Sequence, residues 1–212
     1  MTKIRISQRK IARARAVIPE GDFARAQFDT LAASQLRHLV VILSTPRSGS
    51  TFLCDLCRIN DICVPHEYFQ PQEYLPLLAD RWGCIDGERL DPRAYVEALV
   101  AHRTSAEGIL GINLQGAHIP TFRQFEGMFD AIPVDFVVVR RRDTILQAVS
   151  YEIAGQTRRW SSAFEAGRTP EYSFEQLLSR VRNLAHQNLL VGAYLRSLGV
   201  VPIEIFYEDL LA

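Results

Sequence analysis

The sequence lacks an excess of charge of either sign, and it lacks a long apolar run. Its 212 residues include 24 Lys and Arg and 24 Asp and Glu, so the formal net charge is zero. This balance argues against nucleic acid as a partner and against attraction to an anionic membrane surface. No segment approaches the roughly 20 apolar residues that a bilayer-spanning helix needs. We therefore expect no transmembrane segment.

Cysteine is scarce and confined to one region. The 4 cysteines fall between positions 54 and 84, in a chain long enough to fold without disulfide bonds. We expect free thiols and a cytoplasmic location. Cys54 and Cys57 form a C-x-x-C motif, but a zinc ribbon needs a second close pair, which the sequence does not contain. We therefore expect no metal site and interpret the cysteines as small buried hydrophobic residues.

The order of apolar runs predicts one α/β domain after a basic arm. Residues 1–37 carry no acid before Glu20, and we interpret them as a helical arm with a solvated surface. Over residues 38–212, short β-branched runs alternate with helical patterns, which is typical of a parallel sheet covered by helices. The expected strands are 39–44, 62–67, 109–114, 136–140 and 203–207, and the expected helices are 51–60, 92–103, 144–154 and 173–198.

The strands at 39–44 and 136–140 are almost wholly apolar, which indicates burial on both faces. The fold class is therefore α/β, a three-layer sandwich with a central parallel sheet, similar to the P-loop NTPases. Residues 68–87 and 155–171 mix turn residues with aromatics and predict irregular segments that act as lids or substrate walls.

The strongest chemical signal is the segment Ser44-Thr-Pro-Arg-Ser-Gly-Ser-Thr51, which lies between a buried strand and a helix. Such a loop directs backbone N–H groups and the positive end of the helix dipole at one place, which suits a phosphate. Gly49 lets the backbone approach an anion, the hydroxyl groups can donate hydrogen bonds, and Arg47 supplies a cation. Helix capping would account for the hydroxyl residues but not for the arginine.

Two features of a standard P-loop are missing. The loop has neither the first glycine nor the lysine of G-x-x-x-x-G-K-[ST]. The strand at 136–140 runs into Arg141 and Arg142, where an acid would hold Mg²⁺, and an arginine cluster suits a second anionic group of the ligand. Ser150 lies just over two helical turns beyond Arg142, so the two side chains could converge on one phosphate.

The blocks Thr45-Pro-Arg-Ser-Gly-Ser-Thr51 and Arg142-Asp-Thr-Ile-Leu-Gln-Ala-Val-Ser150 resemble the two phosphate motifs of sulfotransferases that use 3′-phosphoadenosine 5′-phosphosulfate (PAPS). The closer match is to bacterial enzymes that sulfate trehalose glycolipids and lipopolysaccharide, which the segments 65–70, 156–160 and 207–210 also resemble. The resemblance implies sulfuryl transfer from PAPS, without a metal, to a hydroxyl of a carbohydrate or glycolipid. A homodimer is an expected assembly, because relatives are known as dimers.

The resemblance, which extends over residues 39–212, also implies roles for individual residues. It implies that the 5′-phosphosulfate is held by Arg47, Ser48, Gly49, Ser50 and Thr51, and the 3′-phosphate by Arg142 and Ser150. Glu67 falls on the acid that is implied to take the proton from the acceptor hydroxyl, with His66 as the competing base. Arg47 has an implied catalytic role, because it would stabilise charge on the leaving oxygen.

Two other function classes stay open at this point. A nucleotide kinase or NTPase would need a lysine in the loop and Mg²⁺. A non-catalytic nucleotide-binding protein is favoured by Asn113, which stands on the strand where relatives carry a lysine, although His118 is a candidate replacement. The acceptor is not identified, because acceptor walls are built from variable loops.

Overall fold

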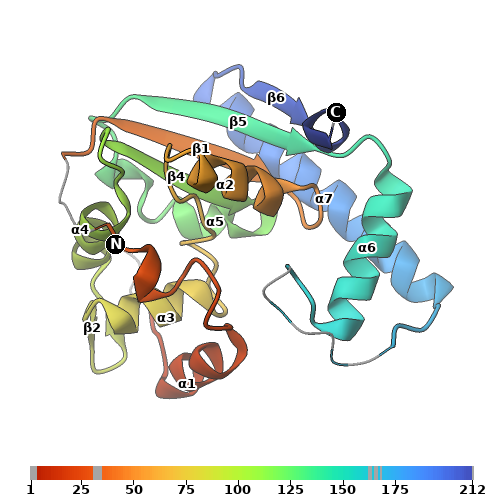
Figure 1. The fold of residues 1–212 in the computed structure, drawn as a ribbon, viewed down its shortest axis with the longest axis horizontal. Coiled ribbons are helices and arrows are strands. Elements are labelled where there is room, and N and C mark those ends of the chain that lie inside the picture. The colour runs from red at the N-terminus through yellow and green to blue at the C-terminus, as the bar shows by residue number, and fades with distance from the viewer. Residues whose placement is uncertain (1–3, 31–34, 162–163, 165–166, 168, 212) are drawn as a thin grey trace.

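A parallel sheet with the strand order β4-β1-β5-β6 forms the centre of the molecule (Figure 1). The computed structural model describes residues 4–30, 35–161, 164, 167 and 169–211, so parts of the predicted arm and of the predicted lid at 155–171 lie outside the described residues. The strands are β1 His38–Ser44, β4 Ile109–Gln115, β5 Val134–Arg140 and β6 Ile203–Phe206. The predicted α/β fold with a central parallel sheet is confirmed.

Helices cover both faces of this sheet. Their bounds are α1 Gln8–Val17, α2 Ser50–Ile59, α3 Tyr74–Arg81, α4 Pro92–Arg103, α5 Ile119–Phe122, α6 Thr144–Thr157 and α7 Phe174–Leu198. Figure 1 shows α2 in front of the sheet and α7 behind it. The four helices predicted from the sequence are all present, with ends that differ by a few residues at most.

The residues of β1 alternate between two apolar cores, as the pleat of a strand requires. Leu39, Val41 and Leu43 belong to the large core, to which α7 contributes Val191 and other residues. Ile42 faces the other way into a small cluster, where it meets Cys54 of α2. The sheet is therefore buried on both faces at β1, in agreement with the apolar sequence of that strand.

The predicted strand at 62–67 is absent. This segment runs beside β4 but makes only an isolated bridge, between His66 and Ile112. Pro65 explains the difference, because proline has no N–H to donate and also restricts the residue before it. The segment still has one anchor, since the backbone N–H of Asn113 donates to the carbonyl of His66 at 2.9 Å.

The region 68–87 is more regular than predicted. It contains α3, and the short strands β2 Ile85–Asp86 and β3 Arg89–Leu90 form a hairpin just after it. The prolines and glycines of the region are typical of a loop, but Pro76 sits in the first turn of α3. A proline is tolerated there because the first N–H groups of a helix have no partner within the helix.

The predicted N-terminal arm of residues 1–37 contains an α-helix, α1, which packs onto the rest of the chain and is not a solvated surface helix. Ile11 and Ala14 of α1 are buried in the large core, as are Ile6 and Ile18 on either side of the helix. Arg13 pairs with Glu73 at 3.1 Å, which ties the polar face of α1 to the start of α3. The helix is thus amphipathic, with its basic side chains outward.

Candidate active site

The loop after β1 has the backbone geometry of an anion cradle. Arg47 and Gly49 both have positive φ, at 63° and 95°, in the left-handed region. Arginine adopts this conformation only at a cost of about 1–3 kcal/mol, and such strain collects at functional sites. Gly49 is required for a second reason. A β-carbon there would lie 2.3 Å from Cδ2 of Tyr207, which packs directly against the loop.

No side chain caps the helix that follows this loop. Gly49 is the N-cap of α2 and makes no capping hydrogen bond, whereas α1, α4, α6 and α7 are capped by Ser7, Asp91, Asp143 and Ser173. The hydroxyl of Ser48 is fully buried and has no hydrogen-bond partner. A buried, unsatisfied hydroxyl beside an uncapped helix N-terminus is the arrangement that an incoming anion would complete.

The two sequence motifs meet at this loop. Nε of Arg47 donates to the hydroxyl of Ser150 on α6 at 3.0 Å, across 103 residues of sequence. Behind this contact, the side-chain amide of Gln147 donates to the hydroxyl of Thr45 at 2.9 Å and to the carbonyl of Pro46 at 2.8 Å. The first loop and α6 are therefore joined on the same side of the sheet.

Positive charge gathers beside the loop without an acidic partner. Burial lowers the pKa of Arg47, and the nearby guanidinium of Arg141 lowers it further. Arg141 lies over the ring of Tyr207, 5.1 Å from its centroid, and its Nε is buried with no hydrogen-bond partner. Within the described part of the chain, no ion pair joins either arginine to a carboxylate. Two neighbouring cations that repel one another would be stabilised by a bound anion.

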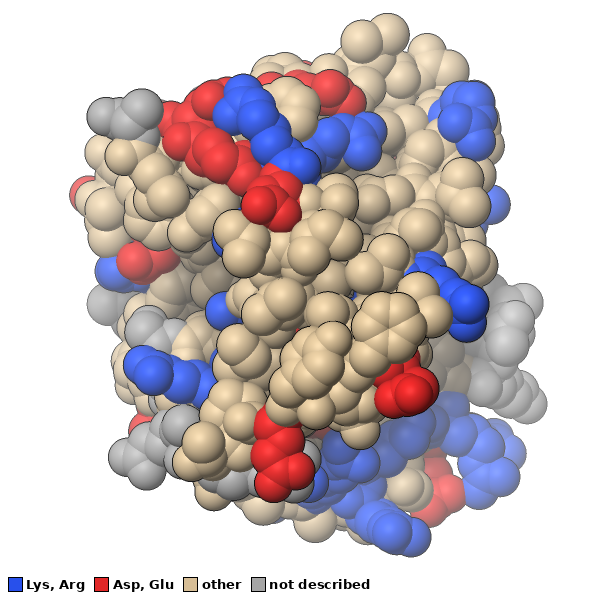
Figure 2. Space-filling model, turned by 90° about the vertical axis from the view of Figure 1, so that its right-hand side faces the viewer, with Lys and Arg blue, Asp and Glu red and all other residues tan. Residues whose placement is uncertain are grey.

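Arg142 is arranged differently from Arg141. Its guanidinium forms a two-pronged pair with Asp209, at 2.7 Å for both contacts, and its backbone N–H donates to Glu208 at 3.1 Å. Figure 2 views the side toward which the strands point, and basic and acidic side chains lie against one another near its upper edge. A phosphate would have to replace the Asp209 carboxylate to bind Arg142 through this fork.

The polar face of β4 links the loop to the predicted base. Nδ2 of Asn113 donates to the hydroxyl of Ser50 at 3.3 Å, and Oδ1 of Asn113 accepts from the hydroxyl of Ser44 at 2.9 Å. Two residues further along the strand, and so on the same face, Nε2 of Gln115 donates to Glu67 at 2.8 Å. Asn113 thus holds the loop serines where relatives were expected to place a lysine.

Glu67 lies in a protected environment. Its side chain is 16% exposed, and burial raises its pKa to about 7, against the opposing effects of His66 and of the hydrogen bond from Gln115. His118 lies 3.7 Å away, but burial lowers its pKa to about 4. His118 is therefore neutral near pH 7 and does not replace the missing cation. The carboxyl group of Glu67 is poised to gain or lose a proton near neutral pH, as a general base must.

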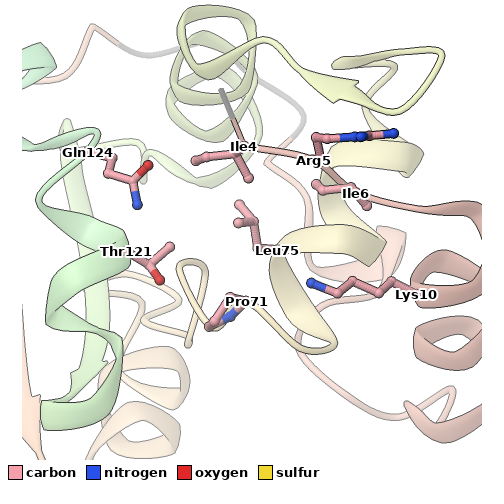
Figure 3. A pocket seen from close by; sticks show the side chains of 8 residues that line it. All are labelled: Ile4, Arg5, Ile6, Lys10, Pro71, Leu75, Thr121 and Gln124. Carbon is pink, nitrogen blue, oxygen red and sulfur yellow. The ribbon is translucent and has the colours of Figure 1, made fainter. Parts of the chain in front are cut away.

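A separate cavity of about 250 Å³ lies between the N-terminal segment, α3 and α5 (Figure 3). Ile4, Leu75 and Thr121 are among its lining residues, and none of the predicted site residues lines it.

Among the described residues, no group of three or more His, Cys, Asp or Glu side chains is placed to hold a metal ion. The same part of the chain contains no helix that is both long and apolar enough to cross a membrane.

Comparison with protein families agrees with this geometry. The Stf0 sulphotransferase family matches residues 39–212, from β1 through the C-terminal segment, where Asp209 pairs with Arg142. The chain belongs to the Stf0 sulphotransferase family. A comparison with curated proteins found no match. The protein is a sulfotransferase, an enzyme that transfers a sulfuryl group.

The sulfotransferase structure brings together most of the residues that the sequence singled out. Arg47, Ser48, Gly49 and Ser50 line one loop, and Ser150 contacts Arg47. Two residues are placed differently: Thr51 has an exposed side chain, and Arg142 is turned to Asp209. Sequence reasoning missed Gln115 and Gln147. The available signals were a glutamine at the end of a strand and a glutamine within a phosphate-motif helix.

Proposed function

We propose that this sulfotransferase uses PAPS as its donor and a carbohydrate or glycolipid hydroxyl as its acceptor. The observation that carries the proposal is the contact between Arg47 and Ser150, which joins the two phosphate motifs at 3.0 Å. PAPS carries two anionic groups, the 5′-phosphosulfate and the 3′-phosphate, so one molecule can engage the loop and the start of α6 at the same time. The buried, unpartnered hydroxyl of Ser48 supports the same assignment.

In the proposed complex, the loop of residues 47–51 holds the 5′-phosphosulfate at the uncapped start of α2. Ser150 holds the 3′-phosphate together with an arginine that follows β5. The family pattern assigns this second role to Arg142, and the structure adds Arg141 as a candidate, because its Nε is buried and unpaired. Arg142 takes part only when its contact with Asp209 opens.

Transfer itself is proposed as an in-line displacement at sulfur. The acceptor oxygen forms the new S–O bond, and the S–O bond to the 5′-phosphate breaks, which releases adenosine 3′,5′-bisphosphate. Negative charge develops on the leaving oxygen, where Arg47 and the N–H groups of α2 stabilise it. The acceptor proton passes to Glu67, whose carboxyl group has a pKa of about 7. The neighbouring His118 has a pKa of about 4 and is therefore neutral, so it forms no ion pair with Glu67.

We also propose a cellular location, an assembly and a domain division for the enzyme. All 4 cysteines are free thiols, which suits a reducing cytoplasm. We also propose a homodimer, with residues 1–37 as an arm that precedes a sulfotransferase domain at 38–212. The alternative of a nucleotide kinase has less support, because the loop carries Arg47 and no lysine.

Calorimetry without divalent metal tests the donor assignment. Adenosine 3′,5′-bisphosphate should bind at least about tenfold more tightly than adenosine 5′-phosphate, since a second charged contact contributes about 1.5–3 kcal/mol. Preference for ATP with Mg²⁺ would instead support a kinase or NTPase. Transfer of labelled sulfate from PAPS to trehalose, a trehalose glycolipid or lipopolysaccharide then identifies the acceptor class.

A further inference from the structure

A buried carboxylate from outside the family domain reaches the residue next to the proposed base. Asp22 precedes residues 39–212, which the family matches, and it is 6% exposed. Its Oδ1 accepts from the backbone N–H of Ala24 at 2.9 Å and lies 3.2 Å from Nε2 of His66. Its Oδ2 accepts from the hydroxyl of Tyr74 at 3.2 Å. Both oxygens are therefore used.

These contacts keep Asp22 ionised in spite of its environment. Burial opposes ionisation, but His66 and the hydrogen bonds from Ala24 and Tyr74 outweigh it, so that the pKa of Asp22 lies below its usual value. A charge in this position is retained in a folded protein only when its partners are fixed. The Asp22 carboxylate is therefore held in place by Ala24 and Tyr74, with Oδ1 3.2 Å from one ring nitrogen of His66.

The ring of His66 is enclosed by aromatic side chains, and its Nε2 lies within ion-pair distance of Asp22. Its side chain is 12% exposed and packs edge-on against Tyr74, with 4.3 Å between ring centroids, and against Tyr68 at 5.8 Å. The backbone of the same residue is held to β4 through Asn113. With Nε2 facing Asp22, Nδ1 is the ring nitrogen left for any other partner.

This arrangement bears directly on Glu67, the next residue. His66 opposes the effect of burial on the pKa of Glu67, whereas Asp22 and Glu73 act in the opposite sense. The orientation of the His66 ring thus enters the environment of the proposed base. In extended backbone, neighbouring side chains point to opposite sides, so fixing residue 66 also fixes the direction of residue 67.

We propose that Asp22 is a positioning residue for sulfuryl transfer, which orients His66 and through it the acceptor side of the site around Glu67. The N-terminal segment thereby completes a site whose other parts all lie in the family domain. The inference rests on the proposed role of the His66–Glu67 pair in handling the acceptor proton. An aspartate that orients a histidine through one ring nitrogen is a recurrent device for fixing the tautomer.

The test uses the full chain with Asp22→Asn, which keeps the shape of the side chain and removes its charge. Turnover is followed as release of adenosine 3′,5′-bisphosphate from PAPS, with trehalose as the probe acceptor and water as the reference acceptor. We expect kcat to fall by about tenfold to a hundredfold, with KM for PAPS changed by less than about twofold. Nitrogen-15 spectra should show His66 as a single Nε2–H tautomer in the parent and as a mixture in the variant.

Asp29→Asn is the matched control. Asp29 is a partly buried aspartate of the same segment, paired with Arg81 at 2.7 Å and Arg103 at 3.0 Å. This variant loosens the segment without touching His66, so kcat and the His66 spectrum should stay as in the parent. Equal losses in both variants would show that Asp22 acts only on stability and would overturn the proposal, as would an Asp22→Asn protein with unchanged kcat.

A Glu67→Gln protein separates this inference from the proposed function. If Glu67→Gln stays active while Asp22→Asn loses activity and its fixed tautomer, then Glu67 is not the base, and positioning of His66 by Asp22 stands. If Glu67→Gln is inactive and Asp22→Asn is not, the base assignment stands and the positioning role is wrong.

Discussion

The proposed active site has a donor side and an acceptor side, which are built from different kinds of groups. On the donor side, the loop of residues 44–51 and the start of α6 meet through arginines, amides and hydroxyls, as in the contact of Arg47 with Ser150. The acceptor side consists of two buried carboxyl groups, those of Asp22 and Glu67, and the imidazole of His66. Groups of the first kind keep one charge state across the physiological range, whereas the carboxyl group of Glu67 has a pKa of about 7.

Because of this difference, we expect donor binding and turnover to depend on pH in different ways. Donor affinity should be almost independent of pH between about pH 5 and pH 9, apart from the ionisation of the nucleotide itself. Turnover should rise with pH, because Glu67 accepts a proton only when it is ionised and its pKa is about 7. Variants on the two sides should therefore change different kinetic parameters.

The largest expected effect comes from the acceptor side. Glu67→Gln should lower kcat by about 10²- to 10⁴-fold, because it removes the base, and should leave the affinity for adenosine 3′,5′-bisphosphate unchanged. In the parent, log kcat should rise with pH up to about pH 7 and then level off, and the variant should lack this rise. Steady-state kinetics and calorimetry across pH measure both quantities.

Glu73→Gln provides the control for this variant, since Glu73 is a nearby carboxylate that pairs with Arg13 at 3.1 Å. It should retain kcat and a rise with pH, with the midpoint moved toward lower pH, because Glu73 contributes to the raised pKa of Glu67. A parent-like pH profile in Glu67→Gln would move the base to His66.

Arg47→Ala should have a smaller effect on kcat but should also weaken donor binding. Loss of one charged donor at the leaving oxygen costs about 10²- to 10³-fold in rate. Because Arg47 also contacts Ser150 and the carbonyl of Trp160, the affinity for adenosine 3′,5′-bisphosphate should fall as well. Arg140→Ala removes a cation of the same region that pairs with Glu204 at 3.0 Å, and it should leave both quantities unchanged. An unchanged affinity for adenosine 3′,5′-bisphosphate in Arg47→Ala would contradict the placement of Arg47 on the donor side.

The acceptor side should cost stability in a way that depends on pH. Burial raises the pKa of Glu67 from 4.5 to about 7, which corresponds to on the order of 3 kcal/mol at about 1.4 kcal/mol per tenfold change in equilibrium. The folded state is penalised only at pH values at which Glu67 would be ionised in the unfolded chain. Glu67→Gln should therefore stabilise the protein by this order above about pH 7, by less as pH falls, and not at all below about pH 4.5. Urea unfolding at several pH values measures the difference, and a stability gain that does not vary with pH would contradict the assignment.

The smallest expected effect belongs to a single donor-side hydroxyl. Ser150→Ala should weaken binding of adenosine 3′,5′-bisphosphate by about tenfold, because a hydrogen bond to a charged group contributes about 1.5–3 kcal/mol. Binding of adenosine 5′-phosphate, which lacks the 3′-phosphate, should not change. Calorimetry with both nucleotides makes the comparison, and equal losses for the two would place Ser150 elsewhere in the site.

The donor side was largely predictable from the sequence, and the acceptor side was not. A strand, a small-residue loop and a helix are consecutive in the chain, so Arg47 and Gly49 could be placed from local patterns alone. The pairing of Arg142 with Asp209 depends on residues 67 apart, and the contact of Asp22 with His66 joins separate segments. Local patterns also missed α3, because Pro76 reads as a helix breaker unless the helix start is known.

Burial is the other quantity that local patterns miss. The sequence offered His118 as a replacement for the missing lysine, yet desolvation lowers its pKa to about 4. The same effect makes Glu67 a better candidate base than its position alone suggested.

A crystal structure of the complex with adenosine 3′,5′-bisphosphate tests the central claim most directly. The account predicts the 5′-phosphate on the backbone N–H groups of residues 47–51, within hydrogen-bond distance of Ser48, and the 3′-phosphate against Ser150 with Arg141 or Arg142. A nucleotide bound with only one phosphate on these residues, or seated away from both motifs, would contradict it.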